Sequence, residues 1–104
     1  MKLSQQRIFF TKDADMRLRQ LKGKMGITPN VICRIGFCRS LNVTTEPQAV
    51  DERDKAREIN RYTLFGEYDM LFCALLSQWK LDSCSILSLD ELCIRHMNRG
   101  VFLV

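Results

Sequence analysis

The sequence predicts a small, mainly α-helical protein of about four helices with one short strand near its N-terminus. Two observations predict this fold: apolar residues recur at spacings of three and four in several segments, and they alternate in one early segment. The 104 residues fit one domain, which we expect to span residues 1–104, with a basic half over 1–41 and a helical half over 55–104. A domain of this size buries a limited share of its surface, so we also expect an oligomer.

The strand and the first helix are predicted in the basic half. Ile8 and Phe10 alternate with their neighbours over the β-favouring segment Arg7–Thr11, which predicts a short strand in need of a partner. The next segment, residues 13–25, carries its apolar residues on one helical stripe: Ala14, Leu18, Leu21 and Met25. Acidic residues in its first turn and lysines in its last suit the helix dipole, and Gly26 is expected to end it.

A second helix is predicted from Pro29 to about Leu41. Thr28 is a favourable N-cap residue, and proline at the first helical position gives up no needed hydrogen bond. Apolar residues cover most of the circumference of this helix: Val31, Ile32, Ile35, Phe37, Cys38 and Leu41. Such a helix must be buried on more than one side, and we expect another subunit to supply part of the cover.

The other helices are predicted after a long connection, residues 42–54. The polar run 51–60 is expected to add a helical turn or two, and apolar spacing predicts a third helix over Gly66–Leu81. A capping box of Ser88 and Glu91 starts a fourth helix that ends at Gly100, with an inner face of Leu89, Leu92, Cys93 and His96 or Met97. The apolar tail 101–104 is expected to dock on the core or on a neighbour.

Composition limits the class of protein. No run of 18 apolar residues occurs and the first residues lack the apolar core of a signal peptide, so we expect a cytoplasmic protein without membrane contact. The cysteines are odd in number and include no Cys-x-x-Cys pair, which favours reduced core residues: Cys33, Cys38, Cys73, Cys84 and Cys93.

The sequence offers little chemistry for catalysis. Cys93 and His96 have a spacing that suits zinc, but no second pair completes a four-ligand site, so we interpret this single histidine as a packed or surface residue. Glycines 23 and 26 do not form a phosphate loop, and Glu67 and Asp69, two apart on a helix, point away from each other. We therefore expect no enzyme activity, no cofactor and no metal.

Charge is distributed unevenly along the chain. Residues 1–41 carry nine basic and two acidic side chains, a net charge of +7, whereas residues 42–104 carry seven basic and ten acidic ones, a net charge of −3. This asymmetry predicts that one face meets a polyanion while the other faces solvent or a protein partner. A solvated basic helix with no nucleic-acid role is the alternative.

The order of strand, helix, Gly-x-Thr turn and apolar helix, from Arg7 to Ile35, resembles ribbon-helix-helix DNA-binding proteins. The resemblance implies that two chains pair their strands into a ribbon, with Gln5, Arg7 and Phe9 facing outward. Because phenylalanine is a poor reader of base edges, this surface favours phosphate contacts over sequence readout.

Three motifs follow one another over nearly the whole chain: residues 26–34 (GITPNVICR), 58–69 (EINRYTLFGEYD) and 96–100 (HMNRG). Together they resemble the DndE family, small accessory proteins of the bacterial DNA phosphorothioation system, which is a restriction-modification system. The resemblance implies a helical, tetrameric, nucleoid-associated protein that binds DNA through a basic surface and has no catalytic residue of its own. It also implies partner proteins for the sulfur chemistry: a cysteine desulfurase, an iron–sulfur protein similar to phosphoadenylyl-sulfate reductases, and an ATPase.

Two residues of the middle motif invite a structural interpretation. Thr63 is expected to cap the third helix. Arg61 is either a phosphate ligand or, the interpretation that we favour, an ion-pair partner of Glu58 or Glu67.

We therefore expect this protein to bind DNA phosphates through the cations of its first helix, with help from other basic residues of the first half. The first group is Arg17, Arg19, Lys22 and Lys24, and the second is Arg7, Arg34 and Arg39. Two alternatives are a ribbon-helix-helix repressor with a palindromic operator and a scaffold protein without DNA affinity.

Overall fold

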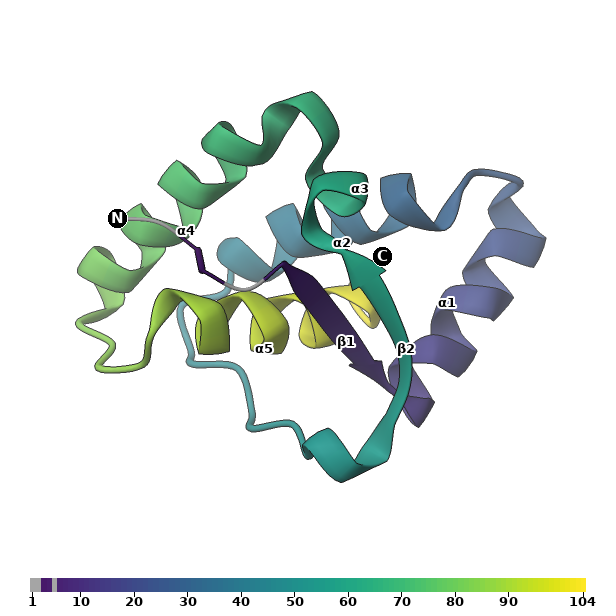
Figure 1. Ribbon diagram of the computed structural model, residues 1–104, viewed down its shortest axis with the longest axis horizontal. Coiled ribbons are helices and arrows are strands. Elements are labelled where there is room, and N and C mark those ends of the chain that lie inside the picture. The colour runs from purple at the N-terminus through teal and green to yellow at the C-terminus, as the bar shows by residue number, and fades with distance from the viewer. Residues whose placement is uncertain (1–2, 5) are drawn as a thin grey trace.

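Figure 1 shows the chain in a computed structural model, which describes residues 3–4 and 6–104. Over these residues the longer helices are α1 (Lys12–Met25), α2 (Pro29–Leu41), α4 (Asp69–Ser83) and α5 (Leu89–Val101). The short elements are β1 (Arg7–Thr11), η1 (Glu52–Asp54), β2 (Lys55–Asn60), α3 (Arg61–Phe65) and η2 (Gly66–Tyr68). The prediction of a mainly helical fold with an N-terminal strand is confirmed, and none of these helices is long and apolar enough to cross a membrane.

Helix α5 crosses the middle of the molecule and packs closely on α2 (Figure 1). A Cβ atom added to Gly36 of α2 would lie 2.5 Å from the carbonyl oxygen of Gly100 in α5, and one added to Gly100 would lie 2.4 Å from the backbone of Gly36. Non-bonded carbon atoms pack at about 3.5–4.0 Å, so only glycine fits at either position. The two helix backbones therefore touch where they cross.

The chain itself covers α2 on several sides. Helices α1, α3, α4 and α5 all pack on it, and Phe37 is fully buried with the rings of Phe65 and Phe72 at 5.3 and 5.8 Å between centroids. We expected another subunit to cover part of this helix, but the chain's own helices provide that cover. Only the start of α2 presents a large apolar side chain to solvent, since Val31 is 38% exposed.

The partner of β1 is β2 of the same chain. The two strands run antiparallel, with Arg7 opposite Asn60 and an irregularity at Phe10 and Thr11. Our prediction of helical turns over residues 51–60 was therefore wrong beyond η1. The sequence did not predict β2 as a strand, because its side chains are exposed or half-buried and show no apolar alternation.

The other edge of β1 is occupied by α5. The side-chain amide of Asn98 donates to the carbonyl oxygen of Phe9 at 3.0 Å, and its oxygen accepts the Thr11 amide at 2.9 Å. Asn98 is 5% exposed, so it replaces a neighbouring strand at this edge. An inter-chain ribbon through β1 is therefore wrong for this fold: Phe9 is half-buried, Arg7 is exposed, and Gln5 lies outside the described residues.

The third predicted helix, Gly66–Leu81, is found as η2 and α4, and the short helix α3 before it was not predicted. Asn60 caps α3 by accepting the amide of Tyr62 at 2.9 Å, so our assignment of the cap to Thr63 was wrong. Gly66 has φ +57°, a left-handed conformation that L side chains rarely adopt, and it ends α3 before η2 leads into α4.

The ends of the remaining helices agree with the sequence in part. Gly26, with φ 67°, ends α1 as predicted, and Thr28 precedes α2 without a side-chain cap bond. Ser88 accepts the amide of Glu91 at 3.1 Å, whereas the Glu91 carboxylate pairs with Arg95 instead of completing the capping box. In the tail, Val101 is buried, residues 103–104 are half-buried and Phe102 is 53% exposed.

Helix α5 also holds the long connection between α2 and η1. Arg99 donates to the hydroxyl of Ser40 at 2.8 Å and to the carbonyl oxygen of Thr45 at 2.7 Å, and Arg95 donates to the carbonyl oxygen of Pro47. The indole of Trp79 donates to the carbonyl oxygen of Val43. These bonds satisfy backbone groups of a segment that has no regular secondary structure.

His96 is fully buried beside this network. The hydroxyl of Ser40 lies 2.7 Å from its Nδ1, and the ring meets Trp79 edge to face with 4.4 Å between centroids. Burial, together with the positive charge of Arg99, lowers the pKa of His96 to about 3. The imidazole is therefore a neutral core residue at physiological pH.

The glycine contact predicts a large difference between two similar substitutions. Gly36→Ala should lower the free energy of unfolding by about 3 kcal/mol, because its methyl group would overlap the Gly100 backbone. Gly23→Ala, on α1 with nothing within 4 Å of the added methyl, should raise stability by at most about 1 kcal/mol. Urea denaturation followed by circular dichroism would measure both, and equal effects would contradict the close crossing.

The pKa of His96 predicts acid sensitivity. The unfolded chain takes up a proton near pH 6.5, whereas folded His96 resists protonation until about pH 3. The contribution to stability is thus complete above pH 6.5 and is lost as the pH falls toward 3, by at most about 1.4 kcal/mol per pH unit. Denaturation at pH 7.0, 5.5 and 4.0 should show a shallower decline in His96→Gln, and identical slopes would contradict this role.

Candidate nucleic-acid surface

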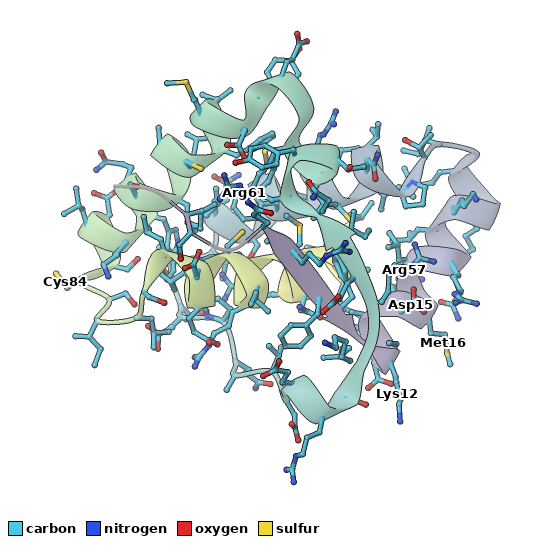
Figure 2. All side chains as sticks on the ribbon, viewed as in Figure 1. Lys12, Asp15, Met16, Arg57, Arg61 and Cys84 are labelled. Atoms are coloured by element: carbon cyan, nitrogen blue, oxygen red, sulfur yellow. The ribbon has the colours of Figure 1, made fainter. Side chains whose placement is uncertain are left out.

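A buried carboxylate organises the cations between α1 and β2. Asp15 is 6% exposed, although an aspartate at the start of a helix is usually solvated. Its two oxygens pair with Arg19 Nε at 3.2 Å and with Arg57 Nε at 2.7 Å, and the second of these pairs ties β2 to α1. Figure 2 shows Asp15 and Arg57 next to each other at this junction. One negative charge thus holds two guanidinium groups at the surface.

Further cations extend this cluster along α1. Lys12, Asp15, Arg19 and Lys22 follow spacings of three, four and three, so they form one stripe on the side of α1 that faces β2. Lys12, Arg19 and Lys22 are exposed, and Lys12 Nζ lies 3.9 Å from Asp54. We call Lys12, Arg19, Lys22 and Arg57 the basic stripe.

The basic stripe runs along one edge of the exposed side of α1, and two other predicted cations lie along the other edge. Arg17 and Lys24 are seven residues apart, which places them on one helical line, and Arg17 donates to Gln20 at 3.4 Å. Met16, which is 60% exposed, lies between this line and the basic stripe. Positive charge therefore flanks the solvent side of α1 on both edges.

Arg34 and Arg39, the predicted cations of α2, are engaged elsewhere. Arg34 donates to the backbone carbonyl oxygens of Leu64 and Thr63 at the end of α3. Arg39 donates to the carbonyl oxygen of Leu103 at 3.3 Å. Each satisfies a backbone group, so the structure does not bring them into the basic stripe.

The side chain of Arg61 is buried and bonds to other residues of the protein. It is 6% exposed, and its guanidinium group pairs with Asp69 at 3.0 Å and donates to the carbonyl oxygen of Leu3 at 2.6 Å. Our interpretation of an ion pair is correct in kind, but the partner is Asp69 rather than Glu58 or Glu67. The bond to Leu3 fastens the start of the chain to α3.

Arg57 and Lys12 are the surface cations that sequence reasoning missed. Arg57 lies in a segment that we predicted as helical turns, and its proximity to α1 depends on the pairing of β1 with β2. Lys12 comes one residue before the predicted start of α1. For Lys12, the helical spacing with Asp15, Arg19 and Lys22 was a usable signal in the sequence.

The cysteines divide into two groups. Cys33 and Cys93 are buried, as predicted, whereas Cys38 and Cys84 are exposed and Cys73 is half-buried, so our assignment of all five to the core was wrong. Burial raises the pKa of the Cys33 thiol to about 12, which makes it unreactive. The described residues hold no group of three or more metal-ligating side chains.

One groove of the molecule differs from the basic stripe in charge. A groove of about 750 Å³ lies between the 45–51 segment and the end of α5. Its walls carry the arginines Arg95 and Arg99 and four carboxylates: Asp13, Glu46, Asp51 and Asp54. Because both arginines donate to backbone oxygens, the groove offers a poor environment for phosphate.

Solved structures share this fold. Over 98% of both chains, the structure is similar to DndE from Escherichia coli B7A, a protein involved in DNA phosphorothioation modification, with a TM-score of 0.79 and 21% sequence identity. A mutant of DndE involved in DNA phosphorothioation matches over 95% of both chains with a TM-score of 0.70 and 20% identity. No curated protein sequence matches this chain.

The family follows from the sequence as a whole. The sequence model of the family of the DNA sulphur modification protein DndE matches residues 7–104, which include every helix and strand described above. The resemblance seen in the three sequence motifs is thereby confirmed. This chain belongs to the DndE family of DNA sulphur modification proteins.

Proposed function

We propose that this protein binds DNA through the phosphates as an accessory protein of DNA phosphorothioation. The observation that carries the proposal is the exposed side of α1, which is flanked by cations and extended by Arg57 of β2 around a single buried carboxylate. Lysine and arginine on an exposed helix suit phosphate contact and carry no base preference. In a tetramer, the same surface is repeated on each copy and the phosphate contacts multiply.

The sulfur chemistry then belongs to partner proteins. Replacement of a non-bridging phosphate oxygen by sulfur needs a sulfur donor and an activated phosphate, and the family resemblance supplies a cysteine desulfurase, an iron–sulfur protein and an ATPase for these steps. The environment of His96 supports an accessory role, because the imidazole is fully buried and offers no surface to a substrate. We place the protein on the nucleoid, where it presents DNA to these partners.

Reversal of a single charge on α1 tests the DNA contact. Lys22→Glu and Lys24→Glu should each weaken binding to duplexes of unrelated sequence about equally, because the contacts are to phosphates. Arg53→Glu, a control with the same charge change, should have little effect, because Arg53 pairs with Asp51 and belongs neither to α1 nor to the basic stripe. Fluorescence anisotropy with labelled duplexes would measure the dissociation constants.

Salt dependence gives a second readout from the same titrations. With about four phosphate contacts, binding should weaken by about 100-fold between 50 and 200 mM salt, and the double variant Lys22→Glu/Lys24→Glu should show a shallower dependence. Undetectable binding by the wild-type protein would favour the scaffold alternative. Strong preference for one palindrome would favour a repressor.

Removal of the buried carboxylate should act in the opposite direction. Asp15→Asn leaves the guanidinium groups of Arg19 and Arg57 without their counter-charge, so DNA affinity at low salt should rise while the free energy of unfolding falls. Anisotropy and urea denaturation of one preparation would measure both quantities. An affinity that falls with stability would contradict a phosphate-binding role for these two arginines.

A further inference from the structure

Helix α4 has a second apolar face that the fold does not cover. Its inner face, Phe72, Leu76 and Trp79, is buried. Four large apolar side chains of the same helix lie in solvent: Met70 (85% exposed), Leu71 (53%), Leu75 (41%) and Leu81 (63%). Exposed apolar side chains clustered on one helix mark an interaction surface more often than scattered ones do.

These residues form a continuous surface along α4. Leu71, Leu75, Gln78 and Asp82 follow spacings of four, three and four, and Ala74 lies beside them, so they share the solvent side of the helix. Met70 and Leu81 widen the surface on one flank. We call Met70, Leu71, Ala74, Leu75, Gln78 and Leu81 the outer face of α4, and it is about 17 Å long.

The outer face lies far from the basic stripe. In Figure 1, α4 and α1 are on opposite sides of the molecule, with α2 and α5 between them. A ligand on the outer face of α4 would therefore leave the cations of α1 free. The two surfaces can be occupied together.

Negative charge marks both ends of the outer face. Glu67 lies one turn before Leu71, and Asp82 lies at the other end; both are exposed. Lys80, the single lysine of α4, is half-buried and donates to the carbonyl oxygen of Leu87. Within η2 and α4, the charges on the solvent side are therefore acidic.

The acidic residues at both ends favour some binding partners of this apolar face over others. A second copy packed antiparallel would place Glu67 against Asp82 of its neighbour, and a parallel copy would place each acid against its equivalent. Both arrangements bring like charges together, which costs binding energy. DNA is disfavoured by the same acids, whereas a helix with basic residues beside its apolar stripe is complementary.

We propose that the outer face of α4 binds an amphipathic helix of another protein. That helix presents apolar side chains spaced three, four and seven residues apart, with lysine or arginine at both ends of the stripe. The partner class rests on the proposed function: it is one of the three proteins of the sulfur chemistry. The protein thus joins a DNA surface on α1 to a protein surface on α4.

Binding experiments with purified proteins test this surface. The cysteine desulfurase, the iron–sulfur protein and the ATPase of the same modification system would be titrated one at a time against the full chain by biolayer interferometry. One of them should bind, and Leu71→Ser/Leu75→Ser should weaken that binding at least tenfold. Met16→Ser, an equally exposed apolar residue on α1, is the matched control and should leave it unchanged.

Charge reversal and solution mass complete the test. Glu67→Lys/Asp82→Lys should also weaken binding several-fold, and cross-linking with mass spectrometry should map the contact to a helix rich in lysine or arginine. Light scattering should give the same mass for Leu71→Ser/Leu75→Ser as for wild type. A smaller mass would assign the face to a second copy and overturn the proposal, as would binding by none of the three proteins or binding unaffected by these variants.

DNA binding separates this proposal from the proposed function. Leu71→Ser/Leu75→Ser, which changes no charge, should bind duplex DNA as the wild type does, because the basic stripe is on the other side of the molecule. Loss of partner binding with intact DNA affinity supports the α4 surface. Absence of DNA affinity in the wild type would reject the proposed function without affecting the measurement at α4.

Discussion

The crossing of α2 and α5 at Gly36 and Gly100 is the contact on which the rest of the structure depends. Because neither residue has a Cβ, the two backbones come close enough for the residues around the crossing to pack as one core. Phe37 follows Gly36 and lies among the rings of Phe65, Phe72 and His96. A wider crossing would separate α3 and α4 from this cluster. The position of these helices therefore depends on glycine at both positions of the crossing.

Helix α5 joins the parts of the fold through polar side chains as much as through apolar ones. Asn98 completes the edge of β1, Arg99 and Arg95 hold the connection after α2, and His96 bonds to Ser40. Each is buried or half-buried and has a partner on another element. A helix with so many polar core residues looks amphipathic in sequence, which is why its central position was not evident before the structure.

Sequence reasoning succeeded where a short segment decides the structure. The strand at Ile8 and Phe10, the capped start of α5 and the glycine end of α1 depend on spacing or on one residue, and the family motifs are contiguous. It failed where a distant element decides the outcome. Lys55–Asn60 is a strand only because β1 pairs with it, and Arg57 joins the cations of α1 only through that pairing. The partner of Arg61 likewise depends on the turn at Gly66, which places Asp69 beside it.

The same distinction explains why charge alone misjudged the candidate site. Arg34 and Arg39 count toward the positive charge of the first half, yet each donates to a backbone oxygen and serves the fold. Arg57 belongs to the acidic half by sequence and to the basic stripe by position. Asp15 subtracts from the net charge, but it orients Arg19 and Arg57 side by side. The proposed DNA surface is therefore set by which cations remain free of backbone partners, and the close crossing of α2 and α5 lies between that surface and the outer face of α4.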